Sequence, residues 1–240
     1  MANIYSFWEN AYNIREESII KEIIPNHGII MEKTLFYPTS GGQPSDKGVI
    51  KFDDQDIKIL DAKKIENEDV LLIPELFPDN LNVGMRGVQE INWELRYKHM
   101  RMHTALHLLS VVIPSPVTGG QIGEIKSRLD FNMPNPIENK KYIEDELNNL
   151  IQQNLNIEQF WIPEIELDNN PTLVKTISVS PPRGLGDIRL IKISLDDKQI
   201  DLQPCGGTHV KNTSEIGRII IGKIEKKGKT NRRVNIHFLE

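Results

Sequence analysis

The sequence predicts an α+β protein: a small all-β domain followed by an α+β domain with helices on an antiparallel sheet. Residues 1–92 carry short strand-like runs separated by turn residues, with no long helical period. That pattern favours a small β-barrel or sandwich. From Trp93 onward, long helical segments alternate with strand-like ones, which is typical of helices packed on a sheet. We therefore expect two domains, 1–92 and 93–240.

The expected strands of the first domain are short apolar runs bounded by glycine, proline, asparagine or aspartate. They cover 28–31, 49–52, 57–60, 70–73 and 87–91. A glycine-rich stretch at 36–48 lies between the first two of these runs and contains Gly41 and Gly42. These two glycines are expected at a turn, and a loop that helps to choose a substrate is the functional alternative.

The second domain is expected to begin with a helix over residues 93–113, which Pro114 ends. Residues 114–120 then read as a loop. A second helix is expected over 137–156, because its apolar residues recur along one face. Strand-like runs cover 122–131, 160–167, 187–193, 216–224 and 233–239.

Composition limits the class of protein. The chain has 240 residues, of which 38% are hydrophobic and 26% charged, as in a folded globular protein. Its single cysteine, Cys205, excludes an internal disulfide and fits a reducing compartment. We expect no signal peptide, and no run approaches ~18 apolar residues. We expect a cytoplasmic protein that neither spans a membrane nor uses a nucleotide cofactor.

Two pairs of potential metal ligands stand out. His103 and His107 are four residues apart in the first expected helix, so both imidazoles lie on one helix face. Cys205 and His209 are also four residues apart, in the segment Cys-Gly-Gly-Thr-His. Three imidazoles and a thiolate are the donor set that zinc prefers. The spacing predicts a Zn²⁺ site, with positive φ at the two intervening glycines.

A basic stretch near the C-terminus contrasts with the net charge of -5. It contains Lys226, Lys227, Arg232 and Arg233. An acidic protein can still bind RNA through one basic face, so these four residues are candidate contacts to RNA phosphates. A solvated hairpin without that role is the alternative. Arg183 is a further candidate for a phosphate contact.

Several motifs together resemble one family. They are His-Thr-Ala-Leu-His at 103–107, Arg-Leu-Asp-Phe at 128–131, Cys-Gly-Gly-Thr-His-Val at 205–210, Thr-Ser-Glu-Ile-Gly at 213–217, and the glycine-rich stretch. These motifs resemble the editing domain of alanyl-tRNA synthetase. The resemblance covers most of the chain and is to the free-standing AlaX editing proteins of the medium-length type.

The resemblance implies an N-terminal β-barrel, an α+β editing domain, and hydrolysis of mischarged alanine tRNA, Ser-tRNA(Ala) or Gly-tRNA(Ala). The partner it implies is the acceptor end of tRNA(Ala). The family's zinc ligands match His103, His107, Cys205 and His209. The family's glutamine before Gly-Ser is matched by Gln121, here followed by Ile-Gly-Glu.

A site that removes serine must pair with its hydroxyl, which alanine lacks. Thr104, Gln121 and Thr208 are candidates for that role, and the Gly206 and Gly207 amides could serve as oxyanion donors. A closed four-ligand site favours a zinc that holds the loop and orients the tRNA end; an ion that polarises a carbonyl or activates water is the alternative. The rival functions are a non-catalytic, zinc-stapled tRNA-binding module and a deacylase with threonyl-tRNA preference.

Overall fold

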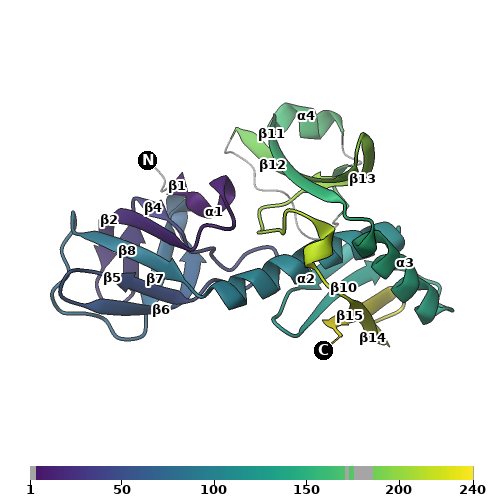
Figure 1. The fold of residues 1–240 in the computed structure, drawn as a ribbon, viewed down its shortest axis with the longest axis horizontal. Helices are drawn as coiled ribbons and strands as arrows, with labels where there is room; N and C mark the ends of the chain where they lie inside the picture. Colours follow the sequence, from purple (N-terminus) through teal and green to yellow (C-terminus); the bar gives the residue numbers. More distant parts are fainter. Residues whose placement is uncertain (1–3, 171–172, 176–185, 240) are drawn as a thin grey trace. The chain divides into compact units, whose positions relative to one another are not determined.

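The computed structural model describes residues 4–170, 173–175 and 186–239. The chain divides into two compact units, Met1–Tyr97 and Lys98–Glu240, which are described separately. The long helix α2 (Trp93–Val112) begins in the first unit and continues into the second (Figure 1). The Asn92 side chain accepts a hydrogen bond from the Leu95 N–H at 3.1 Å and caps the start of this helix.

The first unit is a closed barrel of six strands in the order β2-β3-β7-β6-β5-β8. The strands are β2 (Arg15–Ile24), β3 (Gly28–Met31), β5 (Gly48–Lys51), β6 (Asp56–Lys64), β7 (Val70–Pro74) and β8 (Arg86–Ile91). All barrel neighbours pair antiparallel. Closure leaves no barrel strand with an open edge, and it confirms the barrel alternative over the sandwich.

Small additions complete this unit. A parallel pair joins β1 (Ile4–Tyr5) to β4 (Lys33–Thr34), and the short helix α1 (Ser6–Glu9) follows β1. The barrel interior holds an apolar cluster that includes Ile29, Ile50, Ile59 and Leu72. Gly48 is required where β5 pairs with β8, because a Cβ there would lie 2.1 Å from the carbonyl oxygen of Glu90.

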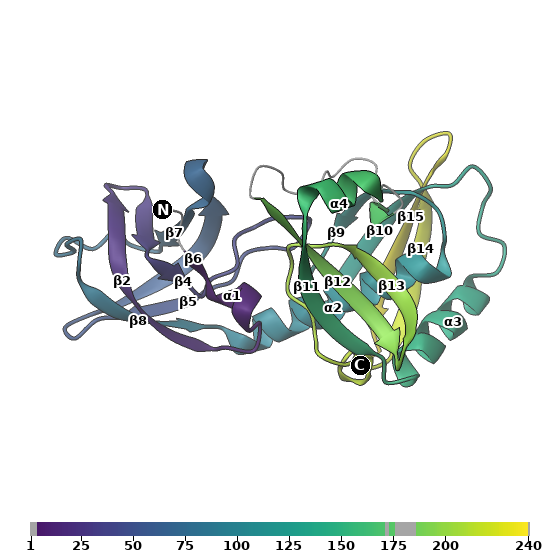
Figure 2. The same cartoon turned by 90° about the horizontal axis from the view of Figure 1, so that it is seen from above.

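The second unit contains two antiparallel sheets, most of α2 and two further helices (Figure 2). The four-stranded sheet has the order β14-β15-β10-β9, and the three-stranded sheet the order β11-β12-β13. Their strands are β9 (Val117–Gln121), β10 (Lys126–Asn132), β11 (Asn156–Pro163), β12 (Asp187–Leu195), β13 (Lys198–Pro204), β14 (Ile219–Lys226) and β15 (Asn231–Phe238). The further helices are α3 (Lys140–Gln152) and α4 (Glu164–Asn169). This arrangement confirms the α+β fold.

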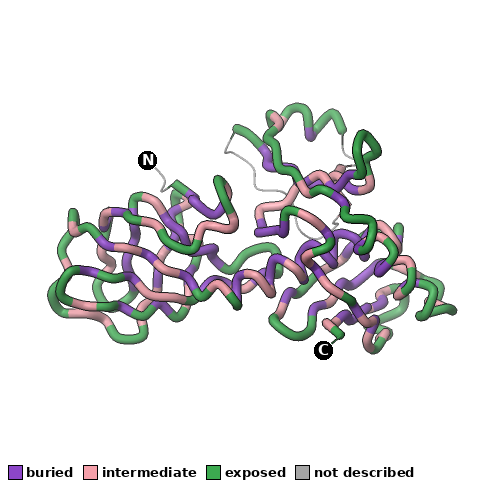
Figure 3. The backbone as a smooth tube through the Cα atoms, in the orientation of Figure 1, coloured by how far each residue is buried: buried purple, intermediate pink, exposed green. Residues whose placement is uncertain are grey.

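Helix α2 lies between the two sheets of the second unit, as both views show (Figures 1 and 2). Residues 102–110 are buried without interruption (Figure 3). A helix buried on all sides is expected at the centre of a unit. The polar side chains that α2 carries into this interior, His103, Thr104 and His107, therefore need partners there.

Helix α3 packs against β14, and one of its side chains binds the strand backbone. Asn148 donates to the Ile219 carbonyl at 2.8 Å and accepts from its N–H at 2.9 Å. The helix is shorter than the expected 137–156. Asn139 caps its start by accepting from Tyr142 N–H, and Asn154 leaves the helix with a φ of 55°.

Two expectations were wrong in detail, and two long strands were not predicted. Residues 117–120 of the expected loop 114–120 belong to the edge strand β9, since Gly119 and Gly120 pair with β10. Residues 164–167 belong to α4 and not to a strand, because the chain turns into a helix directly after Pro163. Strands β2 and β13 had no predicted counterpart. In β13 the buried positions are the polar Asp201 and Gln203, so the usual pattern of buried apolar residues is absent.

Candidate metal centre

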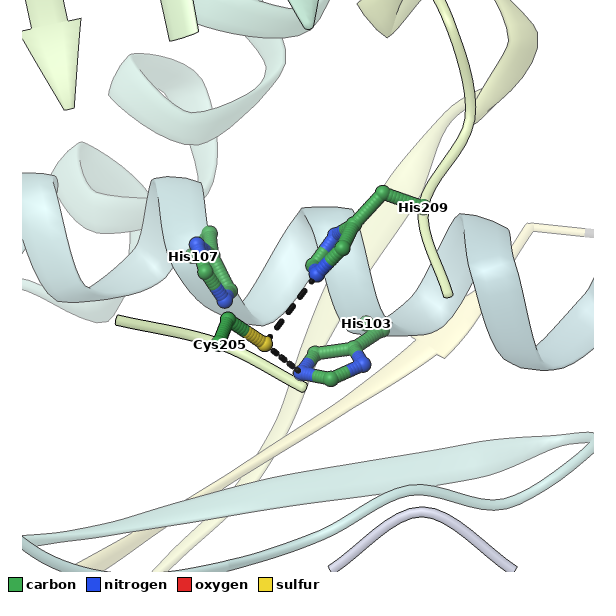
Figure 4. A group of neighbouring side chains, drawn as sticks. All are labelled: His103, His107, Cys205 and His209. Atoms are coloured by element: carbon green, nitrogen blue, oxygen red, sulfur yellow. Dashed lines mark hydrogen bonds between the residues drawn. The ribbon is translucent and has the colours of Figure 1, made fainter. Parts of the chain in front are cut away.

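Four side chains converge in the second unit: His103 and His107 from α2, and Cys205 and His209 from the loop after β13 (Figure 4). One potential ligand atom from each lies within 4.8 Å of all the others. Cys205 Sγ is 3.4 Å from His103 Nε2 and 3.2 Å from His209 Nε2. Two stretches that are distant in the chain thus form one cluster.

His107 is oriented by a carboxylate on β13. Its Nδ1 lies 3.1 Å from Asp201 Oδ2, and the Asp201 side chain is fully buried. Lys175 forms an ion pair with the other carboxylate oxygen, and Gln203 donates to Oδ2 at 2.8 Å. With Nδ1 directed at Asp201, Nε2 faces the cluster, an arrangement common to metal-binding histidines.

The neighbouring charges and hydrogen bonds shift the pKa values of His107 and Asp201. Burial lowers the pKa of His107, but hydrogen bonds to Asp201 and Cys205 outweigh it and raise the pKa to about 9. Burial raises the pKa of Asp201, whereas His107 and Lys175 lower it, with a net value of about 2. In the metal-free protein, Asp201 is therefore a carboxylate that holds the imidazole in place.

Cys205 is prepared as a thiolate. Burial raises the pKa of its thiol, but the neighbouring His103 and His209 lower it well below the usual range. The Gly207 N–H donates to Cys205 Sγ at 3.4 Å. The thiolate is the form that binds metal. The Gly207 amide is thus directed at the sulfur.

Thr104 orients His209. Its hydroxyl donates to the Met100 carbonyl at 3.0 Å and accepts from the Val210 N–H at 3.3 Å. The remaining contact, 3.1 Å to His209 Nδ1, must then be donated by the imidazole, because a hydroxyl has one proton. His209 Nε2 is left unprotonated and faces Cys205. All three hydrogen-bonding positions of this hydroxyl are used inside the protein.

The two glycines of the loop do not have the positive φ that the sequence predicted. Positive-φ glycines among the described residues include Gly41, Gly42 and Gly217, but neither Gly206 nor Gly207. The loop is shaped instead by Arg189, whose guanidinium donates to the Cys205 and Gly207 carbonyls. Thr208 is fully buried within this loop.

Gln121 lies at the end of β9 in a polar network on the four-stranded sheet. It accepts from Arg128 Nε at 3.3 Å, and Arg128 pairs with Asp130 at 2.6 Å. Arg233 also pairs with Asp130, through contacts of 2.8 and 2.9 Å. Burial raises the pKa of Asp130, but the two arginines outweigh it and lower that pKa. Gln121 is therefore linked to Arg233 through Arg128 and the Asp130 carboxylate.

The other basic candidates differ in exposure. Lys226 and Lys227 are exposed at the β14–β15 turn, where Lys227 pairs with Glu225 at 2.8 Å. Arg232 is buried, and its Nη2 donates to the Pro134 carbonyl at 2.9 Å. Arg183 lies outside the described residues.

Gly41 and Gly42 belong to the first unit and form the tip of a tight turn. Ser40 and Gln43 exchange backbone hydrogen bonds of 3.0 and 2.8 Å across them. The φ values are 55° and 83°, and a two-residue turn with both values positive favours glycine. Both glycines are exposed.

The cluster fits a zinc ion by its donor chemistry. Three imidazoles and one thiol match sites known for Zn²⁺, whose bond lengths place tetrahedral ligand atoms roughly 3.3–3.8 Å apart. The measured sulfur–nitrogen separations of 3.2 and 3.4 Å are close to that spacing. Asp201, Gln203 and Arg189, which support this cluster, were missed in the sequence. Asp201 and Gln203 precede Cys205 by four and two residues but were not linked to it, and Arg189 reaches the cluster only through the pairing of β12 with β13.

Comparison with known proteins places this architecture. Residues 186–235 match the family model described as the threonyl and alanyl tRNA synthetase second additional domain. Residues 3–95 match the model described as tRNA synthetases class II (A). A barrel followed by an α+β unit with a His/Cys cluster, together with these two matches, defines a protein related to parts of the aminoacyl-tRNA synthetases.

Curated relatives extend along nearly the whole chain. An alanyl-tRNA editing protein AlaX-M from Methanosarcina mazei is 32% identical over 235 residues, covering 93% of this chain and 92% of that protein. The AlaX-M of Saccharolobus solfataricus is 33% identical, with 91% and 94% covered. The chain belongs to the AlaX-M family of alanyl-tRNA editing proteins.

The same segment also occurs within larger proteins. An alanine–tRNA ligase from Pyrobaculum neutrophilum is 32% identical over 92% of this chain, which spans 25% of that protein.

Among the described residues, no helix is both long and apolar enough to cross a membrane.

Proposed function

We propose that this protein is a zinc-containing deacylase that hydrolyses the ester of mischarged alanine tRNA, with Ser-tRNA(Ala) and Gly-tRNA(Ala) as substrates. The observation that carries the proposal is the cluster of His103, His107, Cys205 and His209 in a member of an editing family. A cytoplasmic location follows from this substrate.

Zn²⁺ would be held by these four side chains, and when bound it would supply positive charge at the end of the tRNA. The protein's own groups prepare the site. Asp201 and Thr104 engage the Nδ1 atoms of His107 and His209, and the three imidazoles are buried. A closed set of four protein ligands favours an ion that orients the acceptor end over one that activates water.

Selection of serine requires polar groups that alanine would leave unpaired. Gln121 and Thr208 remain our candidates for that role. Thr104 is better explained as a positioning residue, since its hydroxyl is saturated by Met100, His209 and Val210. For the developing oxyanion we retain the Gly206 and Gly207 amides as candidates; the Gly207 N–H also donates to the Cys205 sulfur.

Contact with the tRNA backbone is assigned to the exposed Lys226 and Lys227. Arg233 adds charge at the same sheet, although Asp130 pairs with it. Arg232 contributes by holding the turn that carries the lysines, because its guanidinium binds backbone carbonyls. In the first unit, the exposed tip at Gly41 and Gly42 is our candidate for substrate selection.

The test is a deacylation assay with tRNA(Ala) carrying serine, glycine or alanine, and with Thr-tRNA(Thr). We expect release of serine and glycine and retention of alanine. A metal-loaded protein that binds the tRNA but releases no amino acid would be a non-catalytic binding module. Preferential release of threonine would reassign the substrate. Cys205→Ala serves as the inactive control and should lose metal and activity together.

A separate binding assay tests the lysines. Replacing Lys226 and Lys227 with glutamine should lower the salt slope of tRNA binding by about one unit for every phosphate that the variant no longer neutralises. Lys58→Gln and Lys63→Gln, exposed lysines of the barrel, form the matched control. An unchanged slope in the Lys226/Lys227 variant would remove these residues from the interface.

A further inference from the structure

Arg189 on β12 holds Cys205 by both its backbone and its side chain. The Cys205 N–H donates to the Arg189 carbonyl at 3.1 Å. In return, Arg189 Nη1 donates to the Cys205 carbonyl at 2.7 Å and to the Gly207 carbonyl at 2.9 Å. One residue thus fixes two of the three peptide units between Cys205 and Thr208.

The guanidinium is itself anchored on the neighbouring strand. Nε and Nη2 both donate to Gln159 Oε1, at 2.8 and 2.6 Å. Gln159 pairs in register with Ile191, and Arg189 pairs with Trp161, so the two side chains are diagonal neighbours on one face of the sheet. Arg189 is only 6% exposed, and a buried planar fork with fixed donors is a rigid support.

These bonds determine the direction of the loop. In a trans peptide the C=O and N–H point in opposite directions. Because the Cys205 and Gly207 carbonyls point at Arg189, the N–H groups of the following residues, Gly206 and Thr208, point away from Arg189. The intervening Gly207 amide is then placed to donate to Cys205 Sγ. The same geometry sets the sulfur at 3.2 Å from His209 Nε2.

We propose that Arg189 is a positioning residue for the metal loop: its guanidinium holds the Cys205 and Gly207 carbonyls so that the thiolate meets the imidazoles in the geometry the ion requires. This inference rests on the metal-binding part of the proposed function. It adds Arg189, and Gln159 behind it, to the residues on which metal affinity depends.

The experiment measures Co²⁺ and Zn²⁺ affinity of the full chain by competition with a chelator, together with the thiolate-to-cobalt charge-transfer band. Arg189→Met should weaken metal binding about 10–100-fold, the range for residues that orient ligands, and shift or weaken that band. Arg189→Lys should recover part of the affinity, because an ammonium can reach one carbonyl but cannot span the loop and Gln159. Gln159→Leu should weaken binding less than Arg189→Met.

Arg232→Met is the matched control, since Arg232 is also a buried arginine on a backbone carbonyl but belongs to the other sheet. It should retain wild-type metal affinity and spectrum. If Arg189→Met and Gln159→Leu bind Co²⁺ like the wild type, the inference is wrong while the proposed function stands. If the wild type binds neither ion, the metal part of the proposed function fails instead. If Arg189→Met does not fold, Arg189→Lys and Gln159→Leu test the inference in its place.

Discussion

Asp201 Oδ2 and His107 Nδ1 lie 3.1 Å apart in the interior of the second unit, between strand β13 and helix α2. The carboxylate side chain has no solvent exposure, and Lys175 neutralises its second oxygen. A buried charge of this kind is stable only because both of its partners are present. The pair therefore ties the orientation of a potential metal ligand to the position of β13.

Replacing Asp201 with asparagine should weaken zinc binding about 10–100-fold, because a neutral amide replaces the charged acceptor that fixes the Nδ1 proton of His107. Chelator competition measures the effect. Asp130→Asn is the control: it also removes a carboxylate paired with two basic groups, but on the four-stranded sheet, and should leave zinc affinity unchanged. Equal zinc affinity in Asp201→Asn and the wild type would show that His107 needs no such partner.

The Thr104 hydroxyl should matter for metal binding and for stability. In Thr104→Val, the His209 Nδ1–H and the Val210 N–H lose their acceptor in a buried place, which costs about 1–3 kcal/mol of unfolding free energy. Zinc affinity should fall about tenfold. Thr104→Ser keeps the hydroxyl and should keep the affinity. Denaturant unfolding and chelator competition give the two readouts, and a valine variant with wild-type zinc affinity would contradict the orienting role.

Metal removal should loosen the second unit and leave the barrel unaffected. A ligand at about 1,000 times its Kd stabilises the folded state by about 4 kcal/mol, so chelation should lower the melting temperature of this unit. Hydrogen exchange should then accelerate in α2 and in residues 205–210, while the barrel strands exchange as before. Cys205→Ala should not respond to the chelator. Equal acceleration in both units would indicate general damage and not loss of a local site.

Local spacing was sufficient to predict the cluster of four side chains but not the residues that support it. His103 and His107 are related by one helix turn, and Cys205 and His209 by a short loop, so the sequence displays both pairs. Arg189 comes to the cluster only through the pairing of β12 with β13, which no local pattern reveals. Asp201 is close to Cys205 in the chain, but the sequence does not show that its side chain points inward towards His107. The fold class followed from strand and helix periodicity in the same way, whereas β9 was missed because its glycines resemble a loop.

The adjacent Arg232 and Arg233 show a second limit of prediction from the sequence. The sequence presents them as one basic patch, but successive strand residues face opposite sides. Arg232 pairs in register with the buried Phe131, and Arg233 with Asp130. One arginine therefore binds backbone carbonyls in the interior while the other joins a polar network. Which of the two faces outward depends on the pairing of β15 with β10.

The barrel unit depends on a second buried pair, Asp46 and Arg96, whose side chains are both fully buried. Arg96 also donates to the Ala11 and Leu35 carbonyls, each at 2.9 Å, and Asp46 accepts from Tyr37 N–H at 2.7 Å. Asp46 lies shortly after the glycine-rich turn, so the pair fixes that loop to the start of α2. Asp46→Asn would leave the guanidinium buried without its counter-charge.

We expect Asp46→Asn to lower the unfolding free energy of the barrel by about 3–5 kcal/mol, measured by denaturant unfolding. Glu75→Gln is the matched control, because it breaks the exposed pair with Lys58, whose side chains are 47% and 61% accessible; such pairs contribute about 0–1 kcal/mol. Zinc affinity of the second unit should be unchanged in both variants. If Asp46→Asn destabilises the barrel no more than Glu75→Gln does, the ion pair is not needed for stability. Water or the carbonyls of Ala11 and Leu35 would then satisfy the guanidinium. The loop would be held by its contact with Tyr37 and its other backbone hydrogen bonds.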